Sequence, residues 1–151
     1  MIYKGYLKSN IGAICVEDNG EKLISIQLCE KAERDNMSAL TEKAIMQIKE
    51  YFSGIRKSFD LPLELNGTEF QKKVWNELCN IPYGETRSYK DIAEKIGNPK
   101  AVRAVGGANN KNKLMIVVPC HRVIGANGSL TGYAGGVKAK ARLIELEKKY
   151  K

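Results

Sequence analysis

Apolar positions in the first sixty residues form three short runs and then recur at helical spacing, which predicts a small sheet followed by a helix. Asp18-Asn19-Gly20 is typical of a tight hairpin turn and separates two apolar runs. Between Leu40 and Phe52, apolar residues recur three and four positions apart, which predicts a helix. The simplest packing is an antiparallel sheet covered by this helix, with no evident chemical site. The runs that predict strands are 2–7, 11–16 and 23–28.

The second part of the chain is predicted to be mainly helical. Thr68 and Gln71 have the spacing of a capping box, which marks a helix start. Trp75 falls among apolar residues on one side of that helix, so we expect it in the core. A final amphipathic helix is predicted over 137–149.

Two further short helices form a helix-turn-helix pattern. The first opens at Ser88 and ends at Gly97, and Asn98-Pro99 predicts the start of the second. The second helix is expected to run from Lys100 to Val105 and to end at Gly106-Gly107. Many such helix pairs are only packing units, so the pattern alone leaves both a structural role and DNA binding open.

These elements predict an α+β protein with two parts. A small N-terminal antiparallel sheet with a covering helix spans 1–63 and is expected to be structural. A mainly helical, winged-helix-like domain with the helix-turn-helix spans 64–151. No apolar run approaches the length of a membrane span and no signal peptide is evident, so we expect an intracellular, cytoplasmic protein without a membrane partner.

The positive charge is confined to the second part. Residues 1–63 hold nine Lys or Arg and nine Asp or Glu, whereas 64–151 hold sixteen and eight, so the whole excess of +8 lies there. Lys100 and Arg103 fall within the helix-turn-helix, and Ala101 and Ala104 would let its second helix approach a groove closely. A localised basic excess favours a polyanionic partner such as DNA, although a merely soluble basic face has similar odds on charge alone.

Cys120-His121 is the candidate for chemistry. A thiol becomes a good nucleophile when a neighbour takes its proton, and His121 is the only histidine. Adjacent residues point in different directions, so a bridging water is plausible. A buried thiol beside a hydrogen-bonded histidine is the alternative reading. The histidine would need a carboxylate to orient it, and spacing leaves eight open: Glu64, Glu69, Glu77, Glu85, Asp91, Glu94, Glu145 and Glu147.

The remaining cysteines suggest neither a metal site nor disulfides. Cys15, Cys29 and Cys79 have apolar neighbours, so we expect small buried thiols. No Cys-x-x-Cys pair is present, and a single histidine makes a zinc site improbable.

Several segments together resemble the O6-alkylguanine-DNA alkyltransferases (methylated-DNA–protein-cysteine methyltransferases). They stand in that family's order and spacing over roughly 66–147, and together they are highly specific. The matching segments are 67–71, 74–75, 81–86, 88–89, 97–108, 118–124 and 132–136. The chain departs from the family pattern at Lys113, where proline is common, at Ala134, where serine is common, and at Asn109, which is apolar in some members.

The resemblance implies direct-reversal DNA repair. Double-stranded DNA containing O6-alkylguanine would be bound by a monomer, and the damaged base would be flipped out of the stack. The alkyl group would pass irreversibly to Cys120, with one turnover per molecule and no cofactor. His121, held by Glu147 and acting through water, would take the thiol proton, and Asn112 would brace the preceding turn. In bacteria or archaea the protein would be nucleoid-associated.

The resemblance also implies the binding residues. Arg103 would replace the flipped base in the stack, and Ala101, Ala104, Lys100 and Ser88 would contact the DNA. Residues expected to line the base pocket are Tyr89, Val123, Tyr133 and Ala134.

Two alternative functions have other consequences. An alkyltransferase-like protein would bind lesions without reacting, but such proteins lack the cysteine found here at position 120. A helix-turn-helix regulator would need long polar side chains for base readout, whereas the second helix offers mainly Ala and Val. A thiol hydrolase is disfavoured because no separate oxyanion-hole motif is evident.

Overall fold

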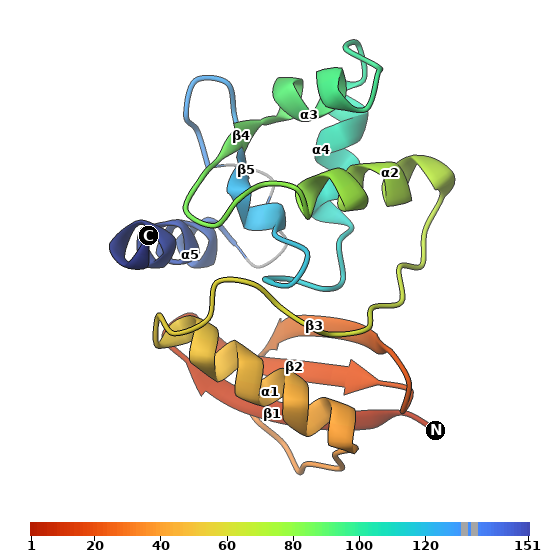
Figure 1. The fold of residues 1–151 in the computed structure, drawn as a ribbon, viewed down its shortest axis with the longest axis vertical. Helices are drawn as coiled ribbons and strands as arrows, with labels where there is room; N and C mark the ends of the chain where they lie inside the picture. Colours follow the sequence, from red (N-terminus) through yellow and green to blue (C-terminus); the bar gives the residue numbers. More distant parts are fainter. Residues whose placement is uncertain (131–132, 134–135) are drawn as a thin grey trace. The chain divides into compact units, whose positions relative to one another are not determined.

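The computed structural model describes residues 1–130, 133 and 136–151 and divides into two compact units (Figure 1). Unit 1 is Met1–Leu65 and unit 2 is Asn66–Lys151. The α+β class is confirmed, with a three-stranded antiparallel sheet in unit 1 and most of the helices in unit 2. No helix within the described part of the chain is long and apolar enough to cross a membrane.

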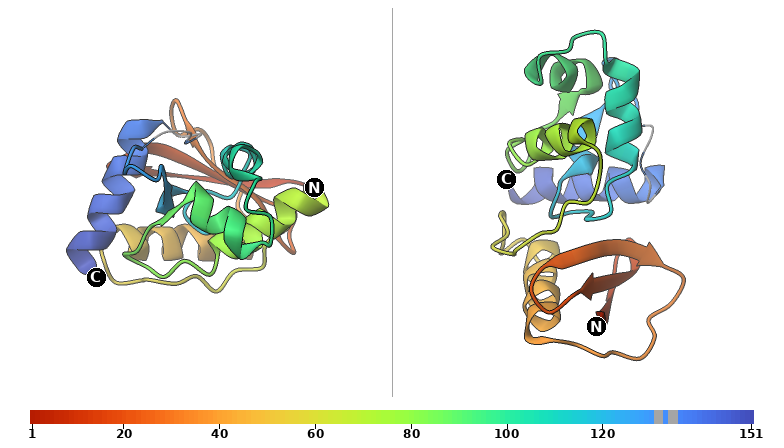
Figure 2. Two further views of the ribbon diagram at one scale, coloured as in Figure 1. Left: turned by 90° about the horizontal axis from the view of Figure 1, so that it is seen from above. Right: turned by 90° about the vertical axis from the view of Figure 1, so that its right-hand side faces the viewer.

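Unit 1 is a meander of three antiparallel strands with one helix on one face (Figures 1 and 2). The predicted hairpin turn is present, with Gly20 at φ 92° between the second and third strands. Alternation places Ile14, Val16 and Ile26 on the buried face, where they meet the helix. The elements are β1 (Tyr3–Ser9), β2 (Gly12–Asp18), β3 (Leu23–Cys29) and α1 (Ala39–Phe52).

A small residue sets how closely α1 approaches the sheet. A Cβ added at Gly5 of β1 would lie 2.4 Å from Ile45 Cδ1 and 2.9 Å from Met37 Sδ. A larger residue at this position would therefore require these side chains to shift. Ile48 and Tyr51 of α1 are fully buried, so each contributes to the apolar burial of the helix.

A buried carboxylate joins the end of β2 to the start of α1. Asp18 is fully buried and accepts hydrogen bonds from the hydroxyls of Ser38 (2.8 Å) and Thr41 and from the Gly20 N–H (2.8 Å). Ser38 and Thr41 also form the capping box of α1. One side chain therefore fixes both the hairpin turn and the helix N-terminus.

Unit 2 packs its short helices around a common core (Figures 1 and 2). Thr68 and Gln71 form the predicted capping box, and Trp75 is 4% exposed, as expected for a core residue. The elements are α2 (Glu69–Leu78), β4 (Arg87–Ser88), α3 (Tyr89–Lys95), α4 (Val102–Asn110), the 3-10 helix η1 (Cys120–Arg122), β5 (Val123–Ile124) and α5 (Val137–Tyr150).

The prediction for α4 was wrong at both ends. The helix starts at Val102 rather than Lys100, because 98–101 form a turn in which the Ala101 N–H donates to the Asn98 carbonyl. It then continues through Gly106-Gly107 to Asn110. Ala108 lies beyond the glycines, is buried, and its carbonyl accepts a 2.8 Å hydrogen bond from the Trp75 indole. Such tertiary contacts offset the low helix propensity of glycine.

The prediction of three buried structural thiols was also wrong. Cys15 and Cys29 are half-buried, because alternation puts them on the sheet face opposite to the buried Ile14 and Val16. Cys79 is exposed, because it caps α2 one residue beyond the last buried position, Leu78.

We predict that Asp18→Ala lowers the free energy of unfolding of unit 1 by about 1–3 kcal/mol, since two hydroxyls and one N–H lose a buried acceptor. Chemical denaturation followed by far-UV circular dichroism measures this change. Asp35→Ala is the matched control, because Asp35 accepts only an exposed hydrogen bond from the Tyr6 N–H. Its effect is expected to stay within about 0.5 kcal/mol, and equal effects of the two variants would contradict the prediction.

Candidate active site

The segment before Cys120 is held in an unusual backbone conformation. Ile116 has φ 74°, and the Val117 N–H donates to the Met115 carbonyl at 2.8 Å, so Ile116 is the centre of a γ-turn with positive φ. Pro119 (φ −80°, ψ 63°) is the centre of an inverse γ-turn closed by the Cys120 N–H and the Val118 carbonyl at 2.8 Å. A β-branched residue with positive φ costs about 1–3 kcal/mol, so surrounding contacts must hold it.

Two buried asparagines supply such contacts. The Asn112 side chain donates to the Val118 carbonyl (2.9 Å) and accepts from the Leu114 N–H (3.0 Å), which links both ends of the strained segment. Asn109, on the inner side of α4, donates to the carbonyl of Cys120 at 3.3 Å. We expected a bracing role for Asn112. The contact of Asn109 was missed, although an amide in place of an apolar residue was visible in the sequence.

Cys120 itself is 3% exposed at the start of η1. Burial raises the pKa of its thiol to about 11, and the Asn112 side chain and the charge of Lys140 oppose this change only in part. Tyr133, which is also buried, interacts with the same thiol, and burial raises the pKa of its hydroxyl as well. The thiol is therefore protonated at neutral pH and needs a base before it can act as a nucleophile.

Among the eight carboxylates that spacing left open, the structure brings Glu147 to His121. The Glu147 side chain extends from α5 and its Oε2 lies 2.5 Å from Nε2 of His121, with both groups buried. Arg122 donates to the same carboxylate from Nε (2.8 Å) and Nη2 (3.1 Å), and from Nη1 to the Ile81 carbonyl (2.7 Å). Sequence periodicity did not predict this cluster of His121, Arg122 and Glu147.

A backbone N–H completes the surroundings of the carboxylate. The Glu85 N–H donates to the Pro82 carbonyl, and Gly84 at the third position of this turn has φ 80°. In that conformation its N–H donates to Glu147 Oε1 at 3.0 Å. Burial alone raises the pKa of Glu147, but His121 and Arg122 outweigh it and hold the pKa well below its ordinary range. Glu147 is therefore a carboxylate at any physiological pH.

A buried lysine contacts Tyr89 and interacts electrostatically with the Cys120 thiol. Lys140 is fully buried. Its Nζ lies 3.5 Å from the Tyr89 hydroxyl and 5.7 Å from the centroid of the Tyr89 ring. Burial lowers the pKa of Lys140, whereas the Cys120 charge raises it. The sequence contained one signal for this position, because Lys140 shares helical spacing with buried Leu143 and Glu147.

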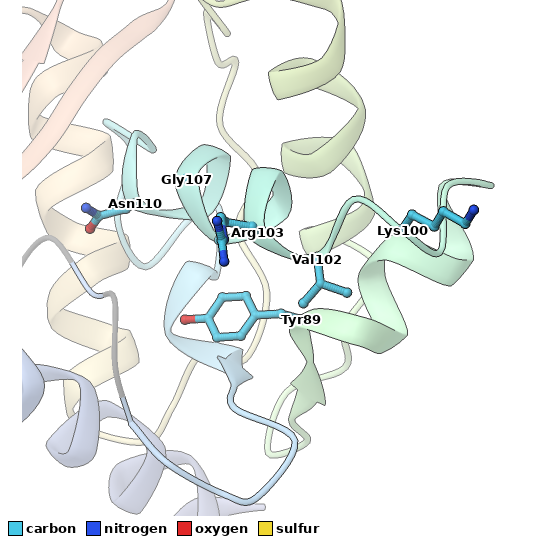
Figure 3. A pocket seen from close by; sticks show the side chains of 7 residues that line it. Tyr89, Lys100, Val102, Arg103, Gly107 and Asn110 are labelled. Atoms are coloured by element: carbon cyan, nitrogen blue, oxygen red, sulfur yellow. The ribbon is translucent and has the colours of Figure 1, made fainter.

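The outer side of α4 borders a separate groove of about 970 Å³. Figure 3 shows Tyr89 from α3 and Arg103 from α4 at this groove, with Lys100 at a distance from Tyr89. Arg103 and Ala104 are exposed. A Cβ at Gly107 would have no heavy atom within 4 Å, so the groove floor is open for the close approach of a partner.

The other predicted binding residues are distributed as follows. Ser88 caps α3 and is half-buried, and its strand β4 pairs in parallel with β5, which contains Val123. Ala101 caps α4 and is half-buried. Ala134 lies outside the described residues. Among the residues that the structure describes, no group of three or more His, Cys, Asp or Glu could hold a metal ion.

We predict that acid destabilises unit 2 through its one histidine. Burial lowers the pKa of His121 from its ordinary value of 6.5. The unfolded state therefore binds the proton first, so the stability contribution is complete above about pH 6.5 and falls as the pH decreases below it, by up to about 1.4 kcal/mol per pH unit. Denaturation at pH 7.0 and 5.5 measures the change, and His121→Gln should have a flatter profile. Parallel profiles for the two proteins would contradict the prediction.

Comparisons with known proteins cover nearly the whole chain. The model described as 6-O-methylguanine DNA methyltransferase, DNA binding domain, matches residues 69–149, and that family's ribonuclease-like domain matches residues 2–65. A methylated-DNA–protein-cysteine methyltransferase of Methanosarcina barkeri is 46% identical over an alignment 153 residues long, which covers 97% of this chain and 97% of that protein. A constitutive one of Bacillus subtilis is 54% identical over 125 residues, 82% of this chain and 73% of that protein.

A solved structure agrees with these sequence matches. The crystal structure of Mycobacterium tuberculosis OGT in complex with DNA has a TM-score of 0.89 and 46% identity, covering 96% of this chain and 92% of that one. The sequence-based resemblance over roughly 66–147 is confirmed, and the comparisons extend it to unit 1. The chain belongs to the 6-O-methylguanine DNA methyltransferase family.

Proposed function

We propose that this protein repairs DNA by direct reversal, transferring the alkyl group of O6-alkylguanine irreversibly to Cys120. The observation that carries the proposal is a buried thiol on the same 3-10 helix as a histidine that contacts a buried carboxylate. The family membership and the relatives named methylated-DNA–protein-cysteine methyltransferases support the same reaction. A cysteine at this position favours transfer over lesion binding without reaction.

The proposed reaction is one displacement at carbon. His121 accepts the Cys120 proton through a bridging water, using Nδ1, since Nε2 faces Glu147. The thiolate attacks the alkyl carbon, so a C–S bond forms while the C–O6 bond breaks. Its electron pair remains on guanine, which takes up a proton. Tyr89, whose hydroxyl lies beside Lys140, is proposed to donate to the base. Val123, Tyr133 and Ala134 are proposed to line the rest of the base pocket.

The groove beside α4 is the proposed DNA interface. Arg103 would occupy the space left in the base stack, and the unobstructed Gly107 would let the helix approach the minor groove. Ser88, Lys100, Ala101 and Ala104 are proposed to contact the backbone and groove. Extrusion of a base costs a few kcal/mol, and less for a damaged base that pairs weakly, which favours the lesion.

Irreversibility follows from the product. A thioether is chemically stable, and none of the described residues near Cys120 offers a route to cleave it. Each molecule would therefore act only once. We propose that it acts as a monomer. The cysteine itself carries the alkyl group, so no cofactor takes part in the proposed reaction.

We predict that incubation with a duplex containing one O6-methylguanine adds a single methyl group, saturating at one per protein, and that peptide mapping locates it on Cys120. Intact-mass spectrometry measures the addition. Cys120→Ala should gain no mass while still binding the duplex, and Cys79→Ala, which removes an exposed cysteine, should react like the wild type. Absence of transfer by a folded, DNA-binding wild type would assign the protein to the lesion-binding class instead.

We also predict that Arg103→Ala weakens binding to methylated duplex by about 1–3 kcal/mol, which is roughly 5- to 150-fold, because one cationic contact and the stacked guanidinium are lost. Fluorescence anisotropy at two salt concentrations measures the affinity and its salt dependence. Lys43→Ala is the control, because Lys43 is an exposed cation on α1 of unit 1. Equal losses in both variants, or affinity independent of salt, would contradict the proposed interface.

A further inference from the structure

The buried carboxylate of the active site is shared between two basic side chains. Glu147 receives the His121 ring at 2.5 Å, two nitrogens of Arg122 at 2.8 and 3.1 Å, and the Gly84 N–H at 3.0 Å. Arg122 is 7% exposed, and its third contact, to the Ile81 carbonyl at 2.7 Å, fixes the guanidinium plane. Its side chain is thus aimed at the same carboxylate that orients the histidine.

This sharing has an electrostatic consequence for His121. A carboxylate that faces a buried imidazole by itself favours the protonated ring, which can no longer accept a proton. Arg122 is always charged and offsets the Glu147 charge in the same low-dielectric surroundings. Arg122 therefore reduces the electrostatic stabilisation that Glu147 gives to the protonated imidazole, while the geometry of the His121–Glu147 contact is kept.

The other titratable groups around this pair do not reverse the balance. Lys140 of α5 adds a second positive charge, and Cys120 lies next to His121 in η1 with its thiol protonated at neutral pH. Burial and the Glu147 charge raise the pKa of the Tyr83 and Tyr133 hydroxyls, so both are neutral. Among the described residues identified here, Glu147 is the negative charge that faces His121.

We propose that Arg122 is a positioning and tuning residue that shares Glu147 with His121 and so keeps the imidazole in its neutral, proton-accepting form. The inference rests on the proposed function, in which His121 is the base for Cys120. It assigns Arg122 a role beyond the structural one suggested by its contact with the Ile81 carbonyl. The shift of the His121 pKa agrees with this role, because burial, Arg122 and Lys140 lower the pKa and together outweigh the opposite effect of Glu147.

The test uses the single histidine of the chain. Its ring signals in a proton NMR spectrum belong to His121 alone, so a pH titration of the whole protein reports this residue directly. In the wild type we expect a midpoint below the ordinary 6.5. This measurement needs no variant, and a midpoint at or above 6.5 would overturn the proposal.

Three variants then separate charge from structure. Arg122→Met should raise the midpoint by about one to three pH units, because Glu147 then faces the imidazole alone. Arg122→Lys keeps the positive charge and should stay nearer to the wild type. The double variant Arg122→Met/Glu147→Gln removes both charges, leaves no unpaired buried ion, and should return the midpoint below 6.5. An unchanged midpoint of the His121 titration in Arg122→Met would contradict the proposal.

A kinetic readout links the tuning to the chemistry. The rate of methyl transfer to Cys120, measured in single-turnover experiments between pH 5.5 and 9, should depend on deprotonated His121. In Arg122→Met the rising limb of the pH–rate profile should move to higher pH by the same amount as the NMR midpoint. In Arg122→Lys the limb should return toward its wild-type position. A purely structural role would lower the rate at every pH without moving the limb, which would overturn the proposal.

The two proposals fail in different ways. If the folded wild type transfers no methyl group, the proposed function is wrong, yet the NMR midpoints still decide whether Arg122 sets the protonation of His121. If transfer occurs but the midpoint of His121 is unaffected by Arg122→Met, the proposed function stands and the role of Arg122 is wrong.

Discussion

The buried carboxylate of Glu147 is the constraint on which the active site depends. It accepts hydrogen bonds from a histidine and an arginine of η1 and from the backbone of the turn at Gly84, so donors from two separate segments meet at a carboxylate of α5. An uncompensated charge at this depth would cost several kcal/mol, so the surrounding elements must keep their places for the carboxylate to remain satisfied. The same contacts that stabilise the buried anion therefore hold the histidine beside the cysteine.

The fold was largely predictable where local chemistry determines it. Short runs of apolar and β-branched residues with the Asp18-Asn19-Gly20 turn located the strands, and the Thr68–Gln71 spacing located the start of α2, because turns and caps are decided within four residues. The limits of α4 were not predictable in this way. Glycine propensity favours a helix end at Gly106, but the Trp75 contact with Ala108 comes from another helix and extends α4 beyond it.

The site was predictable in its nucleophile but not in its network. Cys120 and His121 stand out in the sequence, whereas Glu147 was one of eight candidates until the family resemblance selected it. The contact joins residues that are 26 positions apart, and no local periodicity reports such a pair. The resemblance implies a structural role for Arg122, but its contact with Glu147 was missed for the same reason, as was the contact of Asn109 with the Cys120 carbonyl. Lys140 was hidden among the exposed lysines of α5, and only its spacing with Leu143 distinguished it.

The two sides of α4 have consequences for protein engineering. Its outer side borders the groove with Arg103 and Gly107, while Asn109 on its inner side holds the carbonyl of Cys120. The helix therefore cannot be exchanged between relatives as an independent DNA-reading cassette. A chimera that imports a new groove-facing sequence would have to retain the inward amide and the Trp75 contact, or the strained turn at Ile116 would lose one of its supports.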